Sequence, residues 1–288
     1  MSSDFSSPLL KALDDAVQRG RELGMEVNKR EWEWLLEAAT GTQRIQWILG
    51  THEVLPTTWH ADFKDLVQRR LLGEPVQYII GLGAFYGRDF EVGPDVLIPR
   101  PETELLVEWA VSALKNRPNP KIIDLGTGSG CLAITLALEL NSSRVSALDI
   151  STGALEVAGR NASRLGADVA FSKRDLLLED VPAGPYDLVI SNPPYIPLSE
   201  KATLQSEVVG YEPHVALFAG SDPLLFYRRI AAISRGMLSP SGLVCVEIHS
   251  DFGPDVCHLF ENQHFSNVAV QKDLAGLDRF VTASVGVG

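Results

Sequence analysis

The fold is decided by the stretch KIIDLGTGSG at residues 121–130, which places a glycine-rich turn directly after a short apolar strand. Glycine tolerates positive φ angles and has no Cβ, so this turn lets the backbone approach a bound ligand closely. The N–H groups at the start of the following helix add a binding surface for a polar ligand. We therefore predict a nucleotide-type cofactor beside Asp124, Gly126, Thr127, Gly128, Ser129 and Gly130.

An acidic residue closes the next predicted strand. Asp149 lies 19 residues after Gly130, the position from which a carboxylate binds the hydroxyls of a ribose. That spacing leaves an NAD-dependent enzyme open, but the dinucleotide fingerprint requires glycine where Cys131 stands. The pattern G-x-G-x-G instead suits S-adenosylmethionine, which has no pyrophosphate. A P-loop is excluded because no Gly-Lys-Ser/Thr follows.

A third predicted strand ends just before Asp175 and Leu176. We expect the Asp175 carboxylate to accept a hydrogen bond from an adenine amino group and Leu176 to lie beside the ring. The alternative for Asp175 is a solvated acid on a loop.

Short apolar strands alternate with amphipathic helices after residue 99, the pattern of an α/β doubly wound fold. We predict strands at 121–125, 144–149, 168–172, 187–191 and 242–247, a terminal strand pair at 266–270 and 279–285, and helices at 102–116, 130–140, 152–165 and 222–238. Residues 1–75 have helical spacing and predict a separate helical domain suited to partner recognition. Residues 76–98 are Gly-rich and alternating, which predicts a β-hairpin linker to the domain at 99–288.

Composition narrows the class of protein. A chain of 288 residues that is 45% hydrophobic can bury a full core, and we expect a soluble, cytoplasmic, monomeric protein with no membrane segment. Three cysteines without C-x-x-C spacing, and histidines without metal-ligand spacing, predict no metal. The net charge of -12 weighs against direct nucleic-acid binding, and residues 1–75, with nine Lys/Arg and twelve Asp/Glu, form no basic arm.

The run Ser-Asn-Pro-Pro-Tyr at 191–195 follows the fourth predicted strand and suits a planar NH2 group. The Asn192 side-chain oxygen and the Pro193 carbonyl are two acceptors for its N–H groups. Pro193 and Pro194 stiffen the backbone and lack N–H groups of their own, and Tyr195 adds an aromatic face. An amide nitrogen is a poor nucleophile, so we expect catalysis by positioning, with direct methyl transfer and no dedicated general base.

Two other functions remain open on these residues alone. Methylation of the exocyclic amino group of adenine or cytosine uses a related motif, although the acidic chain offers no region long enough for base-specific recognition. A non-catalytic cofactor-binding module is the second alternative. The intact glycine turn, Asp149 and Asn192 together weigh against it, and cofactor binding without turnover would be its signature.

Four segments together closely resemble the peptide chain release factor N5-glutamine methyltransferases, the PrmC/HemK family. They are LIPRPETE at 97–104, DLGTGSG at 124–130, SNPPYIP at 191–197 and YEPHVAL at 211–217. The resemblance implies a class I methyltransferase domain with a seven-stranded, mostly parallel sheet behind an N-terminal helical domain. It also implies S-adenosylmethionine as cofactor, S-adenosylhomocysteine as product, and the glutamine of a release factor's Gly-Gly-Gln loop as substrate.

The resemblance places the cofactor at residues 126–130, Asp149, Leu176 and Asn192, and the substrate glutamine at Asn192, Pro193, Pro194 and Tyr195. Two positions depart from the family pattern. His249 stands where glycine is frequent, which leaves the local loop shape open, and Leu176 stands where a larger aromatic is common. A glutamine methyltransferase acting on a ribosomal protein remains the nearest alternative, because the Asn-Pro-Pro-Tyr run cannot separate the two substrates.

Overall fold

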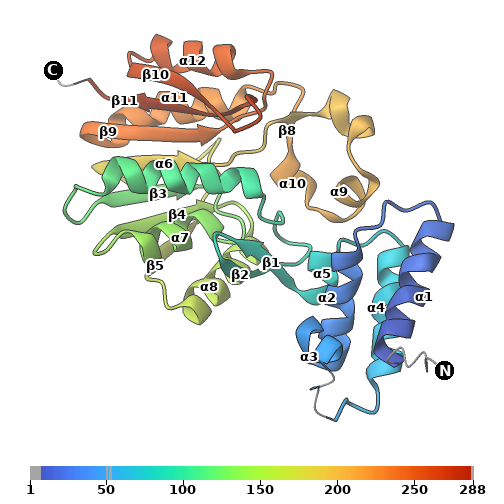
Figure 1. Ribbon diagram of the computed structural model, residues 1–288. Helices are drawn as coiled ribbons and strands as arrows, with labels where there is room; N and C mark the ends of the chain where they lie inside the picture. Colours follow the sequence, from blue (N-terminus) through green and yellow to red (C-terminus); the bar gives the residue numbers. More distant parts are fainter. Residues whose placement is uncertain (1–7, 50, 52–53, 287–288) are drawn as a thin grey trace. The chain divides into compact units, whose positions relative to one another are not determined.

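The computed structural model describes residues 8–49, 51 and 54–286, which form two compact units (Figure 1). The first unit contains the described residues up to Gly81 together with Gln205–Tyr211. The second contains Leu82–Leu204 and the chain from Glu212 onward. Among the described residues, no helix is long and apolar enough to cross a membrane.

A seven-stranded sheet forms the centre of the second unit, in the order β10-β11-β9-β6-β3-β4-β5. Its strands are β3 (Lys121–Leu125), β4 (Arg144–Asp149), β5 (Val169–Lys173), β6 (Tyr186–Ser191), β9 (Leu238–Glu247), β10 (Ser266–Lys272) and β11 (Asp278–Ser284). The run from β9 to β5 is parallel, whereas β11 is antiparallel to both β9 and β10. The predicted α/β fold with a seven-stranded, mostly parallel sheet and a terminal strand pair is therefore confirmed.

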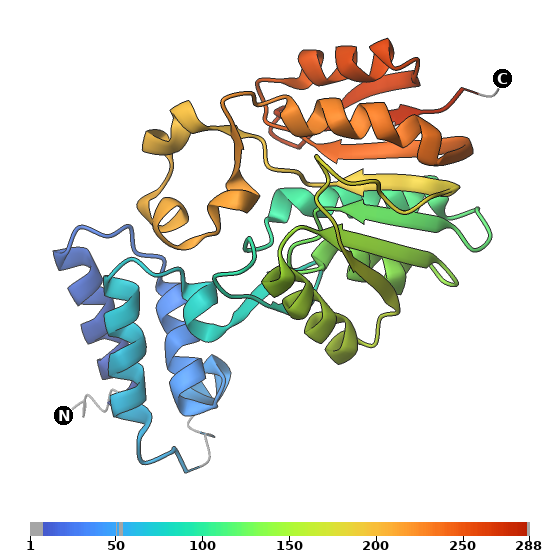
Figure 2. The same ribbon diagram turned by 180° about the vertical axis from the view of Figure 1, so that it is seen from behind.

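Helices cover both faces of this sheet because alternate strand residues point to opposite sides. Ile122 packs with residues of α6 (Glu104–Leu114) and α7 (Cys131–Glu139). Ile123, the next residue, packs with α11 (Leu225–Met237) and α12 (Gly253–Asn262) on the other face. Figure 1 shows α6 across the near face, and Figure 2 shows α11 from behind. The helix α8 (Thr152–Leu165) completes the connection from β4 to β5.

The order of the strands reverses between β3 and β6. The chain passes outward from β3 to β4 and β5, then returns to β6 on the other side of β3. In open α/β sheets, ligands bind at such a switch point, outside the carboxyl ends of the strands. Residues 126–130 follow β3 and residues 192–195 follow β6, so the topology brings the two predicted motifs together.

The predicted hairpin linker differs from the structure in its extent and in its packing. Residues Val76–Ile80 form the short helix α5 and lie in the first unit, so only β1 (Leu82–Phe85) and β2 (Arg88–Glu91) form the hairpin. Phe85 and Phe90 are fully buried and belong to the same core cluster as α6 and α7. The hairpin is therefore part of the second unit, because its aromatic side chains add to that core.

The first unit is a helical bundle, as predicted. It contains α1 (Pro8–Glu22), α2 (Lys29–Thr40), α3 (Arg44–Leu49), α4 (Trp59–Leu71), α5 and α9 (Ser206–Tyr211). Trp32 is 1% exposed and packs with Leu9, Leu13 and Phe63 in the core of the bundle.

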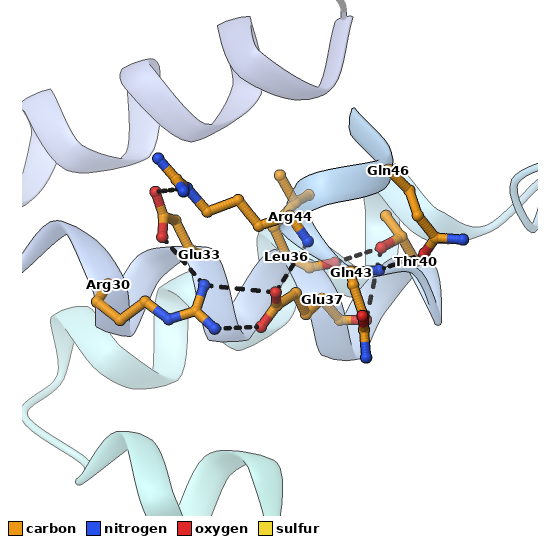
Figure 3. A network of polar contacts seen from close by, with 8 residues as sticks. All are labelled: Arg30, Glu33, Leu36, Glu37, Thr40, Gln43, Arg44 and Gln46. Carbon is orange, nitrogen blue, oxygen red and sulfur yellow. Dashed lines mark hydrogen bonds and ion pairs between the residues drawn. The ribbon is translucent and has the colours of Figure 1, made fainter. Parts of the chain in front are cut away.

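A network of ion pairs joins α2 to α3 within the bundle (Figure 3). The buried Glu33 carboxylate accepts from Arg30 at 3.1 Å and from Arg44 at 2.8 Å. Glu37 also pairs with Arg30, at 3.3 Å, and accepts a hydrogen bond from the Arg44 backbone N–H at 2.9 Å. Three of these four side chains lie on α2, so the network fixes the start of α3 against it.

The inclusion of α9 in the helical unit was not predicted from the sequence. The Arg70 guanidinium is buried and pairs with Glu31 at 3.0 Å and with Glu207 of α9 at 2.7 Å. The Tyr211 hydroxyl donates to the Leu72 carbonyl at 3.2 Å. The segment that follows the Asn-Pro-Pro-Tyr run thus passes through the first unit before the chain returns to the second at Glu212.

Short elements make up the rest of the chain between β6 and α11. They are β7 (Ile196–Pro197), the 3-10 helix η2 (Leu198–Thr203), α10 (His214–Leu217) and β8 (Phe218–Gly220). Another 3-10 helix, η1 (Pro101–Thr103), leads into α6, with Pro101 in its first turn as the sequence predicts.

Candidate active site

The turn after β3 has the backbone conformation that its glycines predict. Gly126, Gly128 and Gly130 have φ angles of +80°, +55° and +82°. The N–H groups of Gly126 and Thr127 both donate to the Leu148 carbonyl at 2.9 Å, which fixes the turn to the end of β4. A Cβ added to Gly126 or Gly128 would meet no protein atom within 4 Å, so the backbone there faces open space. The space can admit a ligand against the main chain.

Gly130 has a different role in the same turn. A Cβ at this position would lie 2.7 Å from Ile134 Cδ1 and 3.1 Å from the Ala158 Cβ. The residue precedes the first residue of α7, and its lack of a side chain allows α7 to pack against α8. Gly130 therefore shapes the site without lining its cavity.

Asp149, at the end of β4, faces the glycine turn. Its Oδ2 accepts from the Gly128 N–H at 2.9 Å and its Oδ1 accepts from the Ser151 N–H at 2.9 Å. Burial raises the pKa of this carboxyl, and these backbone hydrogen bonds oppose the shift. A carboxylate can accept about four hydrogen bonds, so two acceptor positions remain for a ligand.

Asp124 lies beneath the turn. It is fully buried, and its Oδ2 accepts from the Thr127 hydroxyl at 2.7 Å. Burial raises its pKa to about 7. The structure places Asp124 as a support for Thr127 and not in the wall of the cavity.

The loop after β5 also lines the cavity. Leu176 is buried at the cavity, and its carbonyl accepts from the Arg229 guanidinium at 2.9 Å. The Asp175 Oδ1 accepts from the Leu177 N–H at 2.9 Å, and Asp175 is one of the residues that line the cavity. Leu176, although smaller than the aromatic residue common in the resembling family, still offers an apolar surface to a flat ring.

A series of buried hydrogen bonds links two side chains of the Asn-Pro-Pro-Tyr run to Thr103 and Glu247. The Asn192 Nδ2 donates to the Thr103 hydroxyl at 3.2 Å, and that hydroxyl donates to Glu247 Oε2 at 2.6 Å. The Tyr195 hydroxyl donates to Glu247 Oε1 at 3.2 Å. Thr103 and Glu247 are 2% and 3% exposed, so these hydrogen bonds are shielded from water. Burial is the main reason that the pKa of Glu247 is raised to about 7.

The cavity brings together most, not all, of the predicted site residues. Those that line it are Gly126, Thr127, Gly128, Ser129, Asp149, Asp175, Leu176, Asn192, Pro193 and Pro194. The exceptions are Asp124 and Gly130, described above, and Tyr195. The Tyr195 hydroxyl points to Glu247 instead, and its ring lies edge-on to His249, with 6.2 Å between ring centroids.

Several further residues at the site were missed from the sequence. Thr103 and Arg100 line the cavity, and Phe226 of the α11 region does as well. Glu212 is buried and accepts from the Ile98 N–H at 3.2 Å and from Arg100 at 2.5 Å. The sequence signal that could have revealed Glu247 is a lone acid at the end of the otherwise apolar segment LVCVE, residues 243–247.

His249 replaces a residue that is often glycine in the resembling family. Its Nε2 lies 3.2 Å from Glu200 Oε2, and its ring packs between those of Tyr195 and Phe252. The side chain thus links the segment after β9 to η2.

Two family models match different parts of the chain. A model described as "PrmC N-terminal domain" matches residues 11–81, and one described as "Methyltransferase small domain" matches residues 102–209. The release factor glutamine methyltransferase of Chlorobaculum tepidum is 44% identical over 86% of this chain and 87% of its own length. The chain belongs to the release factor glutamine methyltransferase family.

A second relative agrees with this assignment, and a solved structure agrees with the fold. The release factor glutamine methyltransferase of Nitratidesulfovibrio vulgaris is 38% identical over 98% of this chain and 97% of its own length. A crystal structure of a methyltransferase from Pyrococcus furiosus matches 76% of this chain and 98% of its own with a TM-score of 0.52, and its 19% identity supports the fold alone. The family resemblance inferred from the four motifs is confirmed, and the enzyme uses S-adenosylmethionine.

The cavity of this family member fits that cofactor in the chemistry of its walls. Gly126 and Gly128 leave open space beside the main chain, Asp149 has acceptor capacity for two hydroxyl groups, and Leu176 offers an apolar surface for a base. When bound, S-adenosylmethionine supplies an electrophilic methyl group on its sulfonium. Which side chains contact each part of the cofactor remains a prediction.

Replacing Asp149 with asparagine is expected to weaken S-adenosylmethionine binding by about 10- to 100-fold, because charge-assisted hydrogen bonds contribute about 1.5–3 kcal/mol. Isothermal titration calorimetry measures the change. Asp168→Asn, which alters an exposed acid just before β5, is the matched control and should bind as the wild type does. Equal affinity of the two variants would contradict the ribose-binding role of Asp149.

The buried Glu247 makes stability depend on pH in an unusual direction. Its pKa is about 7 in the folded protein against an ordinary value of 4.5, so between these values the native state binds more protons than the unfolded state. The free energy of unfolding therefore falls as pH rises through this window, by about 3 kcal/mol for this group. Urea titrations of wild type and Glu247→Gln at pH 5 and pH 8 should show the wild type losing stability relative to the variant at the higher pH. A constant difference would contradict the raised pKa.

Proposed function

We propose that this enzyme methylates the side-chain nitrogen of the glutamine in the Gly-Gly-Gln loop of peptide chain release factors. The observation that supports it most is the Asn-Pro-Pro-Tyr run at the carboxyl end of β6, beside the glycine turn that follows β3. Relatives covering most of the chain carry the name release factor glutamine methyltransferase.

The residues around Asn192 suit an amide nitrogen. Asn192 lines the cavity, and its Nδ2 is engaged by Thr103, which leaves its Oδ1 as an acceptor for a substrate N–H. The Pro193 carbonyl is the second acceptor in this proposal. Two fixed acceptors hold the nitrogen while positive charge develops on it, and preorganised dipoles of this kind stabilise a transition state without reorganisation.

No separate general base is needed for this reaction. An N-methylated amide that carries an extra proton is a strong acid, so water or a carbonyl oxygen can take the proton. The His249 Nε2 lies 3.2 Å from Glu200 Oε2, so this ring nitrogen is directed to Glu200. The side chains of the run therefore act by holding the substrate nitrogen in place.

We assign partner recognition to the helical unit, together with the hairpin β1–β2. The helical unit includes α9, which follows the Asn-Pro-Pro-Tyr run in sequence. Its charge is mildly acidic, which favours a protein partner over the phosphate backbone of a nucleic acid. We also propose that the enzyme acts as a cytoplasmic monomer.

The substrate is tested by offering the enzyme labelled S-adenosylmethionine with four substrates in parallel. These are a release factor, the same factor with its loop glutamine replaced by alanine, a ribosomal protein extract and duplex DNA. Label in the intact factor alone supports the proposal. Label in ribosomal protein alone would assign the enzyme to that substrate, and label in DNA alone, or equal label in the variant factor, would overturn the proposal.

A further inference from the structure

We propose that Thr103 and Glu247 are positioning residues that hold the Asn192 side-chain amide with its oxygen turned to the substrate. The inference rests on the proposed function, since it assigns Asn192 to the substrate amide. It concerns the buried chain behind the Asn-Pro-Pro-Tyr run, which runs from Asn192 through Thr103 to Glu247 and ends at Tyr195.

The orientation follows from counting donors. A threonine hydroxyl has one hydrogen, and the Thr103 hydroxyl directs it to Glu247 Oε2 at 2.6 Å. It can then only accept from Asn192, so the amide atom that faces it must be the NH2 group, at 3.2 Å. The Asn192 Oδ1 is the amide atom that does not face Thr103, and Asn192 lines the cavity. The oxygen is thereby reserved as an acceptor for a ligand.

Through these hydrogen bonds, the protonation state of Glu247 determines the orientation of the Asn192 amide. An ionised carboxylate only accepts hydrogen bonds, and both of its oxygens do so here, from Thr103 and from Tyr195. A protonated Glu247 can instead donate to the Thr103 hydroxyl. The hydroxyl would then direct its own hydrogen to Asn192, so the Asn192 amide would have to turn its oxygen to Thr103. Its NH2 group would then face the substrate, which itself offers N–H groups. Two donors facing each other cannot form the bond on which positioning depends.

Several groups set the charge of Glu247. Glu102 of η1 opposes its ionisation and Arg279 of β11 favours it. The other titratable side chains that interact with the carboxylate are Tyr195, Tyr227 of α11, Cys245 of β9 and Cys131 of α7. Burial raises the pKa of each of these four groups, which keeps them neutral, so of the side chains named here Glu102 and Arg279 are the charged ones. Its pKa of about 7 allows both forms near neutrality.

The first test separates positioning from packing at Thr103. Thr103→Val keeps the shape of the side chain and removes the hydroxyl, whereas Thr103→Ser keeps the hydroxyl. We expect Thr103→Val to lower kcat by about 10- to 100-fold, the size of a misplacement effect, with little change in S-adenosylmethionine affinity. Thr103→Ser should restore most of kcat. Wild-type kcat in a folded Thr103→Val variant would overturn the inference.

The second test is the pH profile of kcat for wild type and Glu247→Gln. Glutamine carries no charge and, like the protonated acid, can donate to Thr103. We expect wild-type kcat to fall as pH is lowered through the pKa of Glu247, and Glu247→Gln to show a low kcat that is the same from pH 5.5 to pH 8.5. If the kcat of Glu247→Gln still fell at low pH as that of the wild type does, the inference would be contradicted. This result does not depend on whether Thr103→Val folds.

An independent readout does not require turnover. Carbon-13 NMR of the glutamate side-chain carboxyl carbons, with the Glu247 signal assigned by its loss in Glu247→Gln, gives the titration midpoint directly. The midpoint should coincide with that of the kcat profile, and a difference of more than about one pH unit, a factor of ten in proton affinity, would overturn the link. A wild-type enzyme that labels no glutamine would instead refute the proposed function, which keeps the two failures distinct.

Discussion

Asn192→Ala is expected to lower kcat for the release factor by about 10²- to 10³-fold, the cost of removing one preorganised polar contact to the reacting group. The reason is geometric, since Asn192 lines the cavity and is fixed by Thr103 behind it. S-adenosylmethionine affinity should change much less, because the glycine turn and Asp149 are untouched. Single-turnover kinetics and calorimetry on the same preparation measure the two effects separately.

Asn262→Ala serves as the matched control for Asn192→Ala. Asn262 is the last residue of α12 and is exposed, so the same chemical change there should leave both kcat and cofactor affinity at wild-type values. If Asn192→Ala kept full turnover, the assignment of Asn192 as an acceptor for the substrate nitrogen would be wrong. If cofactor affinity fell by the same factor as kcat, Asn192 would be assigned to cofactor binding instead of substrate positioning.

Gly130→Ala is expected to destabilise the protein by about 2–4 kcal/mol and to abolish S-adenosylmethionine binding in the fraction that folds. Two costs add at this position. A non-glycine residue at φ +82° is strained, and the new Cβ would lie 2.7 Å from Ile134 Cδ1 and 3.1 Å from the Ala158 Cβ. Relief of these contacts must displace α7 or α8, and hence the turn from residue 126 onward.

The control for this prediction is Gly159→Ala, one residue beyond Ala158. Gly159 lies inside α8, and a Cβ there would meet no atom within 4 Å. Alanine is favoured over glycine within a helix, so this variant should be more stable by about 0.5–1 kcal/mol. Urea titration gives both values. A Gly130→Ala protein as stable as Gly159→Ala would show that α7 and α8 do not depend on close packing at this turn.

The fold was largely predictable because local sequence patterns indicate its strands and motifs. The strand Lys121–Leu125, the glycine turn after it and the acid Asp149 occur in the spacing that a doubly wound sheet requires. The switch point between β3 and β6 then follows from the connection rules for parallel strands. This is why Asn192 and the glycine turn could be expected at one cavity.

The parts that could not be predicted depend on contacts between distant segments. The chain Asn192–Thr103–Glu247 joins residues 89 and 144 positions apart, and no local pattern signals such a contact. The same holds for α9, whose Glu207 pairs with Arg70 from 137 positions away. Tyr195 does not line the cavity, and its hydroxyl donates to the buried carboxylate of Glu247, so its contact with the substrate stays a prediction.

The most direct test of the account is tandem mass spectrometry of a release factor after incubation with the enzyme and S-adenosylmethionine. The account predicts one added methyl group on the fragment that carries the Gly-Gly-Gln loop, located on the side-chain nitrogen of its glutamine. It also predicts no such fragment when Asn192→Ala replaces the wild type for the same short time. A methyl group on any other residue, or an unmodified factor beside a fully methylated ribosomal protein, would contradict it.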